Sequence, residues 1–252
     1  MSFAVAADAY DRFMGRYSIP LGPRLADFAG VARGHRALDV GCGPGALIAE
    51  LVQRTGAAAV SAVDPSDPFV EAVRARFPEV DVRRASAEDL PFSDGEFDVA
   101  LAQLVVHFMA DPVAGLREMA RVTRPDGVVA ACVWDLATDE GPLGTFWSAA
   151  RSLDPELTGE SQLPGAREGH LAELLEAAGL RDVEDRVLSV DVEHASFEEW
   201  WEPFTLGVGP AGRHVAGLEA ARRDELRQRC RDLVPPAPFV MTARAWAARG
   251  VA

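Results

Sequence analysis

The sequence predicts an α/β fold in which helices cover both faces of a mostly parallel sheet. Between residues 36 and 135, apolar runs of β type alternate with helical patterns, which is typical of β–α–β units. The 252 residues, 48% of them apolar, suffice for one large domain with a core. No apolar run reaches the ~18 residues that a membrane-spanning helix needs.

Five runs in this region are predicted to be strands because they are short, apolar and rich in β-branched residues. Parallel strands joined by helices are buried on both faces, which suits runs that are mainly apolar. The runs are 36–40, 58–64, 79–85, 97–103 and 127–134.

The segments between these strands carry helical patterns. In 68–77, apolar residues at positions 69, 70, 73 and 77 share one face of a helix. A second helix is predicted over 111–127, where Asp111 is the expected N-cap and Pro112 occupies the first turn. Pro125 and Gly127 should end it.

The pattern changes after Asp135. Residues 138–168 are rich in Gly, Pro and acidic residues around a helical stretch at 143–153. A helix over 170–180 should close at Gly179. Then follow an alternating strand at 183–194, a helix at 196–207 with Ser196 and Glu199 at capping-box spacing, a polar helix at 217–234 and a last strand at 239–249.

Charge and cysteine content limit the function classes. The net charge of −14 opposes broad binding to nucleic acid phosphates. Three scattered cysteines without a CxxC pair indicate reduced thiols rather than a disulfide framework or a zinc site. The first residues lack a signal-peptide pattern, so we expect a cytoplasmic location. Abundant arginine and alanine without any lysine suggest a GC-rich bacterial genome.

The stretch ALDVGCGPGAL (37–47) runs from a strand through three glycines into a helix. Such a turn lets a ligand approach the backbone closely, and three interpretations are open: a dinucleotide site, a methyl-donor site, or a tight turn without a ligand. Asp64 ends the second strand, where a carboxylate can accept both hydroxyls of a ribose. An Asp-Pro turn is the structural alternative for Asp64.

The segment ASAEDLPFSDGEFDVALAQLVVHFMADP (85–112) helps to decide between a dinucleotide and a methyl donor. Together with LDVGCGPG, AVDPS and RVTRPDG, it resembles class I S-adenosylmethionine-dependent methyltransferases. The branch that it resembles most acts on small molecules and includes the ubiquinone-biosynthesis type. The specific motifs cover roughly residues 35–135; segments 138–168 and 196–235 carry none.

The resemblance implies a Rossmann-like sheet of seven strands, the last of them antiparallel, with helices on both faces and a small helical cap. S-adenosylmethionine would lie over the carboxyl ends of the first four strands. We expect a single domain over 1–252, with its core at 30–137, 169–195 and 237–250. The expected cap and lid segments are 1–22, 138–168 and 196–236.

The resemblance also assigns residues to the methyl donor. Ser86 stands where the family usually has an aspartate that reaches the adenine, so Glu88 is the alternative partner. Gln103 is expected near the sulfonium. The expected binding residues are Asp39, Gly41, Cys42, Gly43 and Gly45 around the methionyl part and the ribose edge, Asp64 at the ribose hydroxyls, Pro65 and Ser66 beside the adenine, and Ser86, Ala87, Glu88 and Gln103.

A catalytic base is required only if the acceptor must lose a proton. His107 follows the fourth strand and is the candidate; a packing role for its ring is the alternative. The histidines at 170, 194 and 214 are scattered without metal-ligand spacing, so we expect no metal and place them on the surface.

Residues 10–18 predict an amphipathic helix, and the resemblance implies that an N-terminal helix closes over the donor. Tyr10 and Tyr17 are the candidate lid contacts, and Arg16 is a candidate partner for the donor's carboxylate. Packing against the core is the alternative for this helix.

Acceptor choice should come from segments that the family motifs do not cover. Their aromatic residues predict a pocket for a small aromatic or hydrophobic molecule, with docking of the cap as the alternative. These residues are Phe146, Trp147, Trp200, Trp201 and Phe204.

We therefore predict a methyltransferase that acts as a monomer or homodimer on a small molecule, without nucleic acid or membrane partners. A donor-binding protein without transfer activity, acting as a sensor or partner subunit, is the first alternative. A nicotinamide-dependent oxidoreductase is the second.

Overall fold

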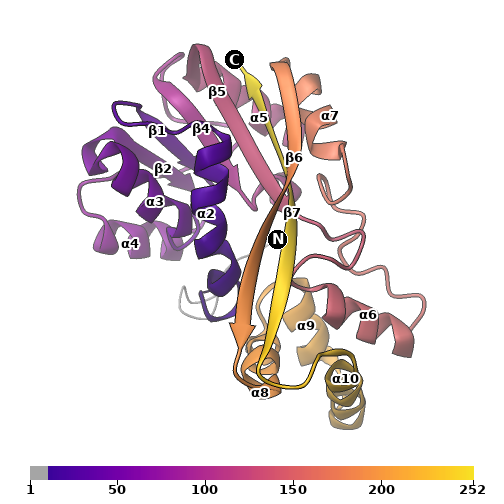
Figure 1. Ribbon diagram of the computed structural model, residues 1–252. Helices are drawn as coiled ribbons and strands as arrows, with labels where there is room; N and C mark the ends of the chain where they lie inside the picture. Colours follow the sequence, from indigo (N-terminus) through magenta and orange to yellow (C-terminus); the bar gives the residue numbers. More distant parts are fainter. Residues whose placement is uncertain (1–10) are drawn as a thin grey trace.

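A seven-stranded sheet forms the centre of the computed structural model, which describes residues 11–252 (Figure 1). The strand order is β3-β2-β1-β4-β5-β7-β6, and β7 runs antiparallel to both of its neighbours while β1 to β5 are parallel. This confirms the predicted sheet. The strands are β1 (Ala37–Val40), β2 (Val60–Asp64), β3 (Asp81–Arg84), β4 (Phe97–Gln103), β5 (Thr123–Trp134), β6 (Arg181–His194) and β7 (Phe239–Val251).

Helices cover both faces of the sheet because side chains along each strand alternate between the two faces. In β4, Val99 and Leu101 join the core on one face, whereas Ala100 and Ala102 join the core on the other. The first face packs against α2 (Arg16–Phe28), α3 (Ala46–Thr55) and α4 (Asp67–Arg76). The second packs against α5 (Pro112–Val122) and α7 (His170–Ala177).

The predicted helix signals act as expected. The carboxylate of Asp111 accepts a hydrogen bond from the backbone N–H of Ala114 at 3.0 Å, which caps α5. Gly179 has φ +94° and follows the C-cap residue Ala178 of α7, where a left-handed residue ends the helix. The Ser196 hydroxyl accepts a hydrogen bond from the N–H of Glu199 at 3.1 Å.

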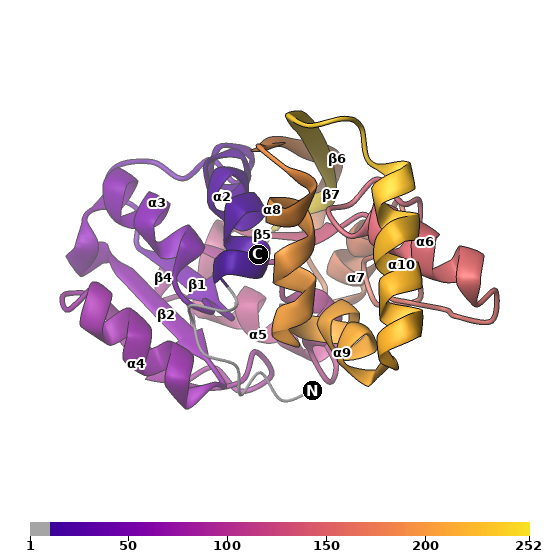
Figure 2. The ribbon, with the colours of Figure 1, turned by 90° about the horizontal axis from the view of Figure 1, so that it is seen from below.

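A group of helices lies beyond the carboxyl ends of the parallel strands, at the bottom of Figure 1. The long β6–β7 ribbon extends down to this group, which Figure 2 shows from below. Its members are α6 (Gly144–Leu153), α8 (Phe197–Trp201), η4 (Glu202–Leu206), α9 (Gly209–Gly217) and α10 (Ala220–Leu233). Three further short helical segments are η1 (Asp11–Gly15), which leads into α2, η2 (Ala57–Ala59) and η3 (Val106–Phe108).

One boundary and one helix differ from the predictions. Strand β5 begins at Thr123, so α5 is shorter than the predicted helix; the residue before a proline avoids the helical region, which favours an extended Arg124. Helix α9 was not predicted because its sequence, GPAGRHVAG, contains three glycines, which are poor helix formers.

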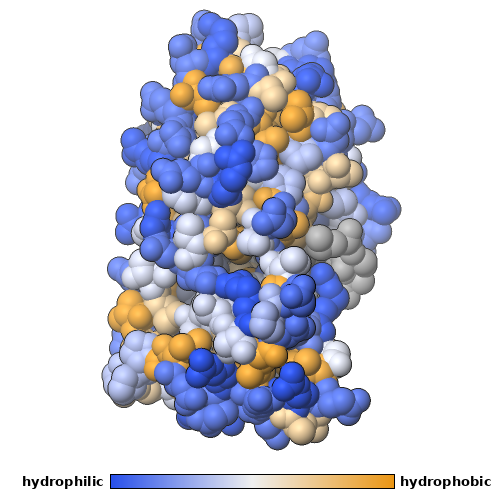
Figure 3. All heavy atoms as spheres, turned by 90° about the vertical axis from the view of Figure 1, so that its right-hand side faces the viewer, coloured by the Kyte–Doolittle hydropathy of each residue, from blue (hydrophilic) through white to orange (hydrophobic). Residues whose placement is uncertain are grey.

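The surface is largely polar on the face seen in Figure 3, where hydrophobic residues form small separate groups. Within residues 11–252, no helix combines the length and the apolar character that crossing a bilayer requires.

Candidate active site

The loop between β1 and α3 opens the site. Gly41 and Gly43 have φ of +73° and +52°, a region that favours glycine. A Cβ on Gly41 would lie 2.5 Å from a methyl carbon of Val105, whereas a Cβ on Gly43 would meet no atom within 4 Å. Gly41 therefore permits close packing, and Gly43 leaves open space at the backbone.

The Asp64 carboxylate holds this loop in place from the end of β2. Its Oδ2 accepts a hydrogen bond from the backbone N–H of Gly43 at 2.9 Å, and its Oδ1 accepts one from Ser66 at 2.8 Å. Burial raises the pKa of Asp64, and these two hydrogen bonds oppose that shift. The carboxylate still lines the open space beside Gly43.

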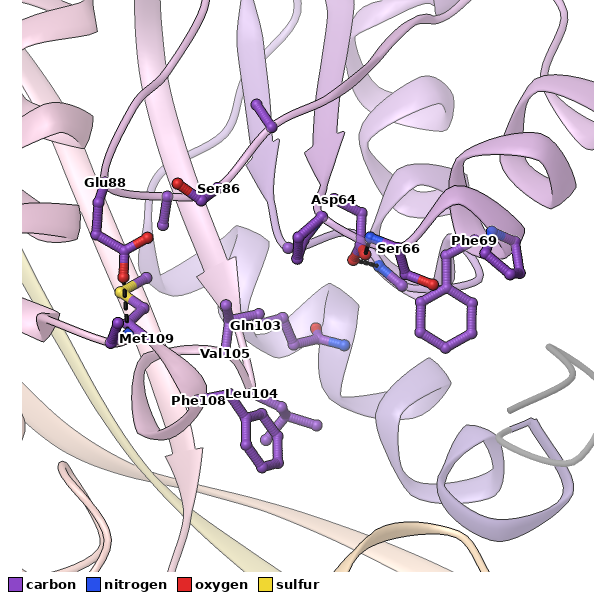
Figure 4. A pocket seen from close by; sticks show the side chains of 17 residues that line it. Asp64, Ser66, Phe69, Ser86, Glu88, Gln103, Leu104, Val105, Phe108 and Met109 are labelled. Carbon is purple, nitrogen blue, oxygen red and sulfur yellow. Dashed lines mark hydrogen bonds between the residues drawn. The ribbon is translucent and has the colours of Figure 1, made fainter. Parts of the chain in front are cut away.

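A cavity of about 460 Å³ lies over the carboxyl ends of β1, β2 and β4 (Figure 4). In the close-up, Asp64, Ser66 and Phe69 form one side, Ser86, Glu88 and Met109 the other, and Gln103 lies between them. The predicted residues that line it are Gly41, Gly43, Asp64, Pro65, Ser66, Ser86, Ala87, Glu88 and Gln103.

Sequence reasoning missed a second group of lining residues. Most of them are apolar and carry no chemical signal beyond that of a core residue; only their place next to the predicted ones indicates a role. They are Pro68, Phe69, Ala85, Leu104, Val105, Phe108, Met109 and Ala110.

Glu88 ties the wall opposite Asp64 to the start of α5. Its Oε1 accepts hydrogen bonds from the backbone N–H groups of Ala110 at 2.8 Å and Asp111 at 3.3 Å. Asp64 and Glu88 are the charged residues among those that line the cavity, and no arginine lines it within residues 11–252. The cavity therefore suits a cation better than a pyrophosphate.

Gln103 joins the cavity to the N-terminal helix. Its Nε2 donates a hydrogen bond to the backbone carbonyl of Ser18 at 2.9 Å, which fixes the orientation of the amide. Its Oε1 is buried and has no hydrogen-bond partner among the described residues. An unpaired acceptor beside the cavity is suited to a ligand that carries N–H donors.

Asp39, Cys42 and Gly45 lie beneath or beside the loop and do not line the cavity. Asp39 is 1% exposed, and its Oδ2 has no partner among the described residues. Burial, and then the charge of Asp64, raise its pKa to about 8. A Cβ on Gly45 would lie 3.2 Å from the ring of Phe77, so this glycine serves packing against α4.

His107 is buried next to the cavity in η3 and does not line it. Burial lowers its pKa to about 3, so its ring is neutral at physiological pH. Its Nδ1 has no hydrogen-bond partner within the described part of the chain. These surroundings resemble those of a packed ring more than those of a base.

The candidate lid residues that the structure describes do not line the larger cavity. Tyr10 lies outside the described residues. Arg16 and Tyr17 contact His194 at the end of β6 instead of the cavity. The prediction that His194 is a surface residue is wrong, because its side chain is 1% exposed and pairs with α2, which is distant in sequence.

The aromatic residues of the cap pack mainly on one another. The rings of Phe146 and Phe204 stack with centroids 4.6 Å apart, and Trp147 donates a hydrogen bond from Nε1 to the buried Glu160 at 2.9 Å. Trp200 and Phe204 also line a second, much smaller cavity near Tyr17. Docking of the cap therefore explains most of these side chains.

A family model described as "Methyltransferase domain" matches residues 38–131. The match contains every residue that lines the larger cavity. The resemblance to methyltransferases is confirmed. We call residues 38–131 the methyltransferase segment.

Curated relatives match about half of the chain. A Mycobacterium tuberculosis protein named as an uncharacterized methyltransferase is 36% identical over 135 residues, which cover 54% of this chain and 52% of that protein. The chain spans about half the length of the curated relatives it matches.

Three solved structures share the fold over 92% of this chain or more, which includes regions outside the methyltransferase segment. The YcgJ protein of Bacillus subtilis has a TM-score of 0.60 at 20% identity and covers 93% of this chain and 97% of its own. A geranyl diphosphate methyltransferase in complex with S-adenosylmethionine gives 0.55 at 16% identity, over 100% and 93%. The [4+2]-cyclase SpnF gives 0.56 at 19% identity, over 92% and 81%.

Proposed function

We propose that this protein transfers a methyl group from S-adenosylmethionine to a small-molecule acceptor. The observation that carries the proposal is the cavity at the carboxyl ends of β1, β2 and β4, with open space at Gly43 and acidic residues on both walls. Its position within the methyltransferase segment supports the same ligand.

The residues present fit the donor. The unpaired Oε1 of Gln103 and the carboxylates of Asp64 and Glu88 offer acceptors to a cationic ligand with hydroxyl and N–H groups. In this proposal Asp64 holds the ribose hydroxyls, the open space at Gly43 leaves room for the methionyl part, and Pro65, Ser66 and Ala87 contact the adenine.

The donor supplies an activated methyl group on its sulfonium when bound. The chain's own contribution is alignment and exclusion of water. Leu104, Val105, Phe108 and Met109 give the cavity an apolar wall, which lowers the local polarity and keeps the reacting atoms away from solvent. A general base is needed only for an acceptor that must lose a proton.

A calorimetric titration tests the donor assignment. We expect S-adenosylhomocysteine, the demethylated product, to bind with measurable affinity, while NAD and NADP do not. Tight binding of NAD without any binding of S-adenosylhomocysteine would contradict the proposal. A methyl-transfer assay with a labelled donor against a panel of small phenols, amines and acids then tests transfer itself.

One observation supports a donor-binding protein without transfer activity as the second candidate. Asp64 and Glu88, the titratable side chains that line the cavity, both accept hydrogen bonds from backbone N–H groups. A protein that binds S-adenosylhomocysteine but yields no methylated product across the panel would favour this second candidate.

A further inference from the structure

A second site lies where the N-terminal helix meets the end of β6 and the cap. A cavity of about 10 Å³ is lined there by residues of η1, α2, α8 and η4, together with Pro142, Leu143 and His194 of β6. This volume accommodates one atom group the size of a water molecule. None of its lining residues belongs to the methyltransferase segment.

A chain of hydrogen bonds, which we call the relay, joins three residues that line this cavity: Arg16, His194 and Tyr17. Nη1 of Arg16 lies 3.0 Å from Nδ1 of His194 and 3.3 Å from Oε1 of Glu199. Nε2 of His194 lies 3.1 Å from the hydroxyl oxygen of Tyr17. His194 and Tyr17 are 1% and 4% exposed, so water does not compete for these bonds.

The chemistry of the relay fixes the direction of its hydrogen bonds. A guanidinium can only donate, so Nδ1 of His194 must accept from Arg16. A neutral imidazole with an unprotonated Nδ1 carries its hydrogen on Nε2, which donates to the Tyr17 oxygen. Burial and the charge of Arg16 lower the pKa of His194 to about 4, so the ring is neutral at pH 7.

The hydroxyl hydrogen of Tyr17 is therefore free to be donated elsewhere. Tyr17 lines the small cavity, and so does Trp200, whose buried Nε1–H has no partner among the described residues. Nε of Arg16 is a further buried donor without a partner there. The cavity thus gathers donors that lack an acceptor, between the side chains of Phe13, Met14 and Phe204.

We propose that this second cavity anchors a carboxylate or carbonyl oxygen of the methyl acceptor, with Tyr17 and Trp200 as the hydrogen-bond donors. Arg16 and His194 are positioning residues that direct the Tyr17 hydroxyl. Only the polar end of the ligand enters, because the cavity admits a single small group; the apolar part of the ligand rests on the aromatic wall. That the ligand is the methyl acceptor rests on the proposed function. The existence of the binding site does not.

The side chain of Gln103 places this site next to the larger cavity. Gln103 lines the larger cavity and donates to the carbonyl of Ser18, the residue after Tyr17. Tyr17 in turn packs edge-on against Trp134 at the carboxyl end of β5, with ring centroids 6.3 Å apart. The two cavities are thus neighbours along the same edge of the sheet.

The test uses the full chain with ¹⁵N-labelled tryptophan and histidine, with and without S-adenosylhomocysteine. The probes are benzoate, benzamide and, as a cationic control, benzylammonium. We expect benzoate or benzamide to shift the indole N–H signal of Trp200 downfield in a saturable way, and benzylammonium to leave it unchanged. The Trp200→Phe variant assigns that signal.

Variants then separate binding from folding. Tyr17→Phe and Trp200→Phe should each weaken the binding of the responding probe about tenfold or more, the loss expected for a hydrogen bond to a charged or polar oxygen. Trp201→Phe, on the same helix but outside the cavity, should change it less than twofold. All three should bind S-adenosylhomocysteine like the parent protein.

Several results would overturn the inference. They are the absence of any saturable shift with benzoate and benzamide, equal binding of benzylammonium, and unchanged probe affinity in both Tyr17→Phe and Trp200→Phe. A His194 ring protonated on Nδ1 would also overturn it, because the Tyr17 hydrogen would then be used on His194. Failure of S-adenosylhomocysteine to bind, with the probe results intact, would contradict the proposed function and leave this site standing.

Discussion

Asp39 is a carboxyl whose ionisation is made unfavourable first by its burial and then by the charge of Asp64. Its pKa of about 8 in the folded state lies above the ordinary value of about 4 in the unfolded chain. Between these pH values the folded state binds more protons than the unfolded state, so the free energy of unfolding decreases as the pH rises. The stability that protonated Asp39 contributes to the folded state is fully present below pH ~4 and is lost as the pH rises through ~8.

Replacing Asp39 with asparagine should remove this dependence. We expect Asp39→Asn to be more stable than the parent protein at pH 8.5, by on the order of a few kcal/mol, with a difference that shrinks toward pH 4. Thermal unfolding between pH 4 and pH 9 measures it. Parallel curves for the two proteins would show that Asp39 does not titrate in this range.

Gly43 allows a matched test of the loop. In Gly43→Val the new side chain enters open space beside Asp64, at a φ that costs about 1–2 kcal/mol for a residue with a Cβ. Gly56 at the end of α3 has φ +87° and equally open surroundings but lies away from the cavity. We expect calorimetry to show that both variants lose stability but that only Gly43→Val loses affinity for S-adenosylhomocysteine.

His107 gives opposite expectations for a base and for a packed ring. Because burial holds its pKa near 3, turnover should not rise with pH through the ordinary imidazole range. His107→Ala should lose about 1–3 kcal/mol of stability, while each folded molecule turns over at the parent rate. A 10²-fold or greater loss of turnover at unchanged donor affinity would restore the base.

At the level of elements, the start of α5 supports one wall of the cavity. Asp111 caps this helix, and the two residues before the cap line the cavity. Asp111→Ala should lower the free energy of unfolding by about 1 kcal/mol, measured by urea denaturation. The exposed Asp185 in β6, replaced in the same way, should change it by less than about 0.5 kcal/mol.

The sequence predicts most elements because their signals are local. Apolar runs, the cap at Asp111 and the Gly179 stop each depend on a few neighbouring residues, and all are confirmed. Helix α9 is the exception: its glycines give no local preference, and its packing against η4 and the rest of the cap stabilises it.

The site was predicted less completely for the same reason. Polar lining residues such as Asp64 and Gln103 follow strands and are visible in the sequence. Apolar ones such as Val105 and Met109 look like any core residue. The Arg16–His194–Tyr17 relay joins residues far apart along the chain, so no spacing rule could reveal it.

At the scale of the whole molecule, the net charge of −14 predicts behaviour toward nucleic acids. Each phosphate contact would require a local basic group and would release a counterion on binding. We expect a gel-shift titration with RNA at physiological salt to show no complex. Affinity that falls steeply with added salt would contradict the small-molecule assignment.

Strand β6 ends the sheet and, among residues 11–252, has a neighbouring strand on one side only. A free edge of 14 residues is a template on which another extended chain can add, which is the usual route to aggregates and fibres. Charged side chains occur along most of this strand, among them Asp182, Asp185, Arg186, Asp191 and Glu193. An incoming strand would have to place its own side chains against the charges of β6. This edge of the sheet therefore disfavours the addition of a further strand.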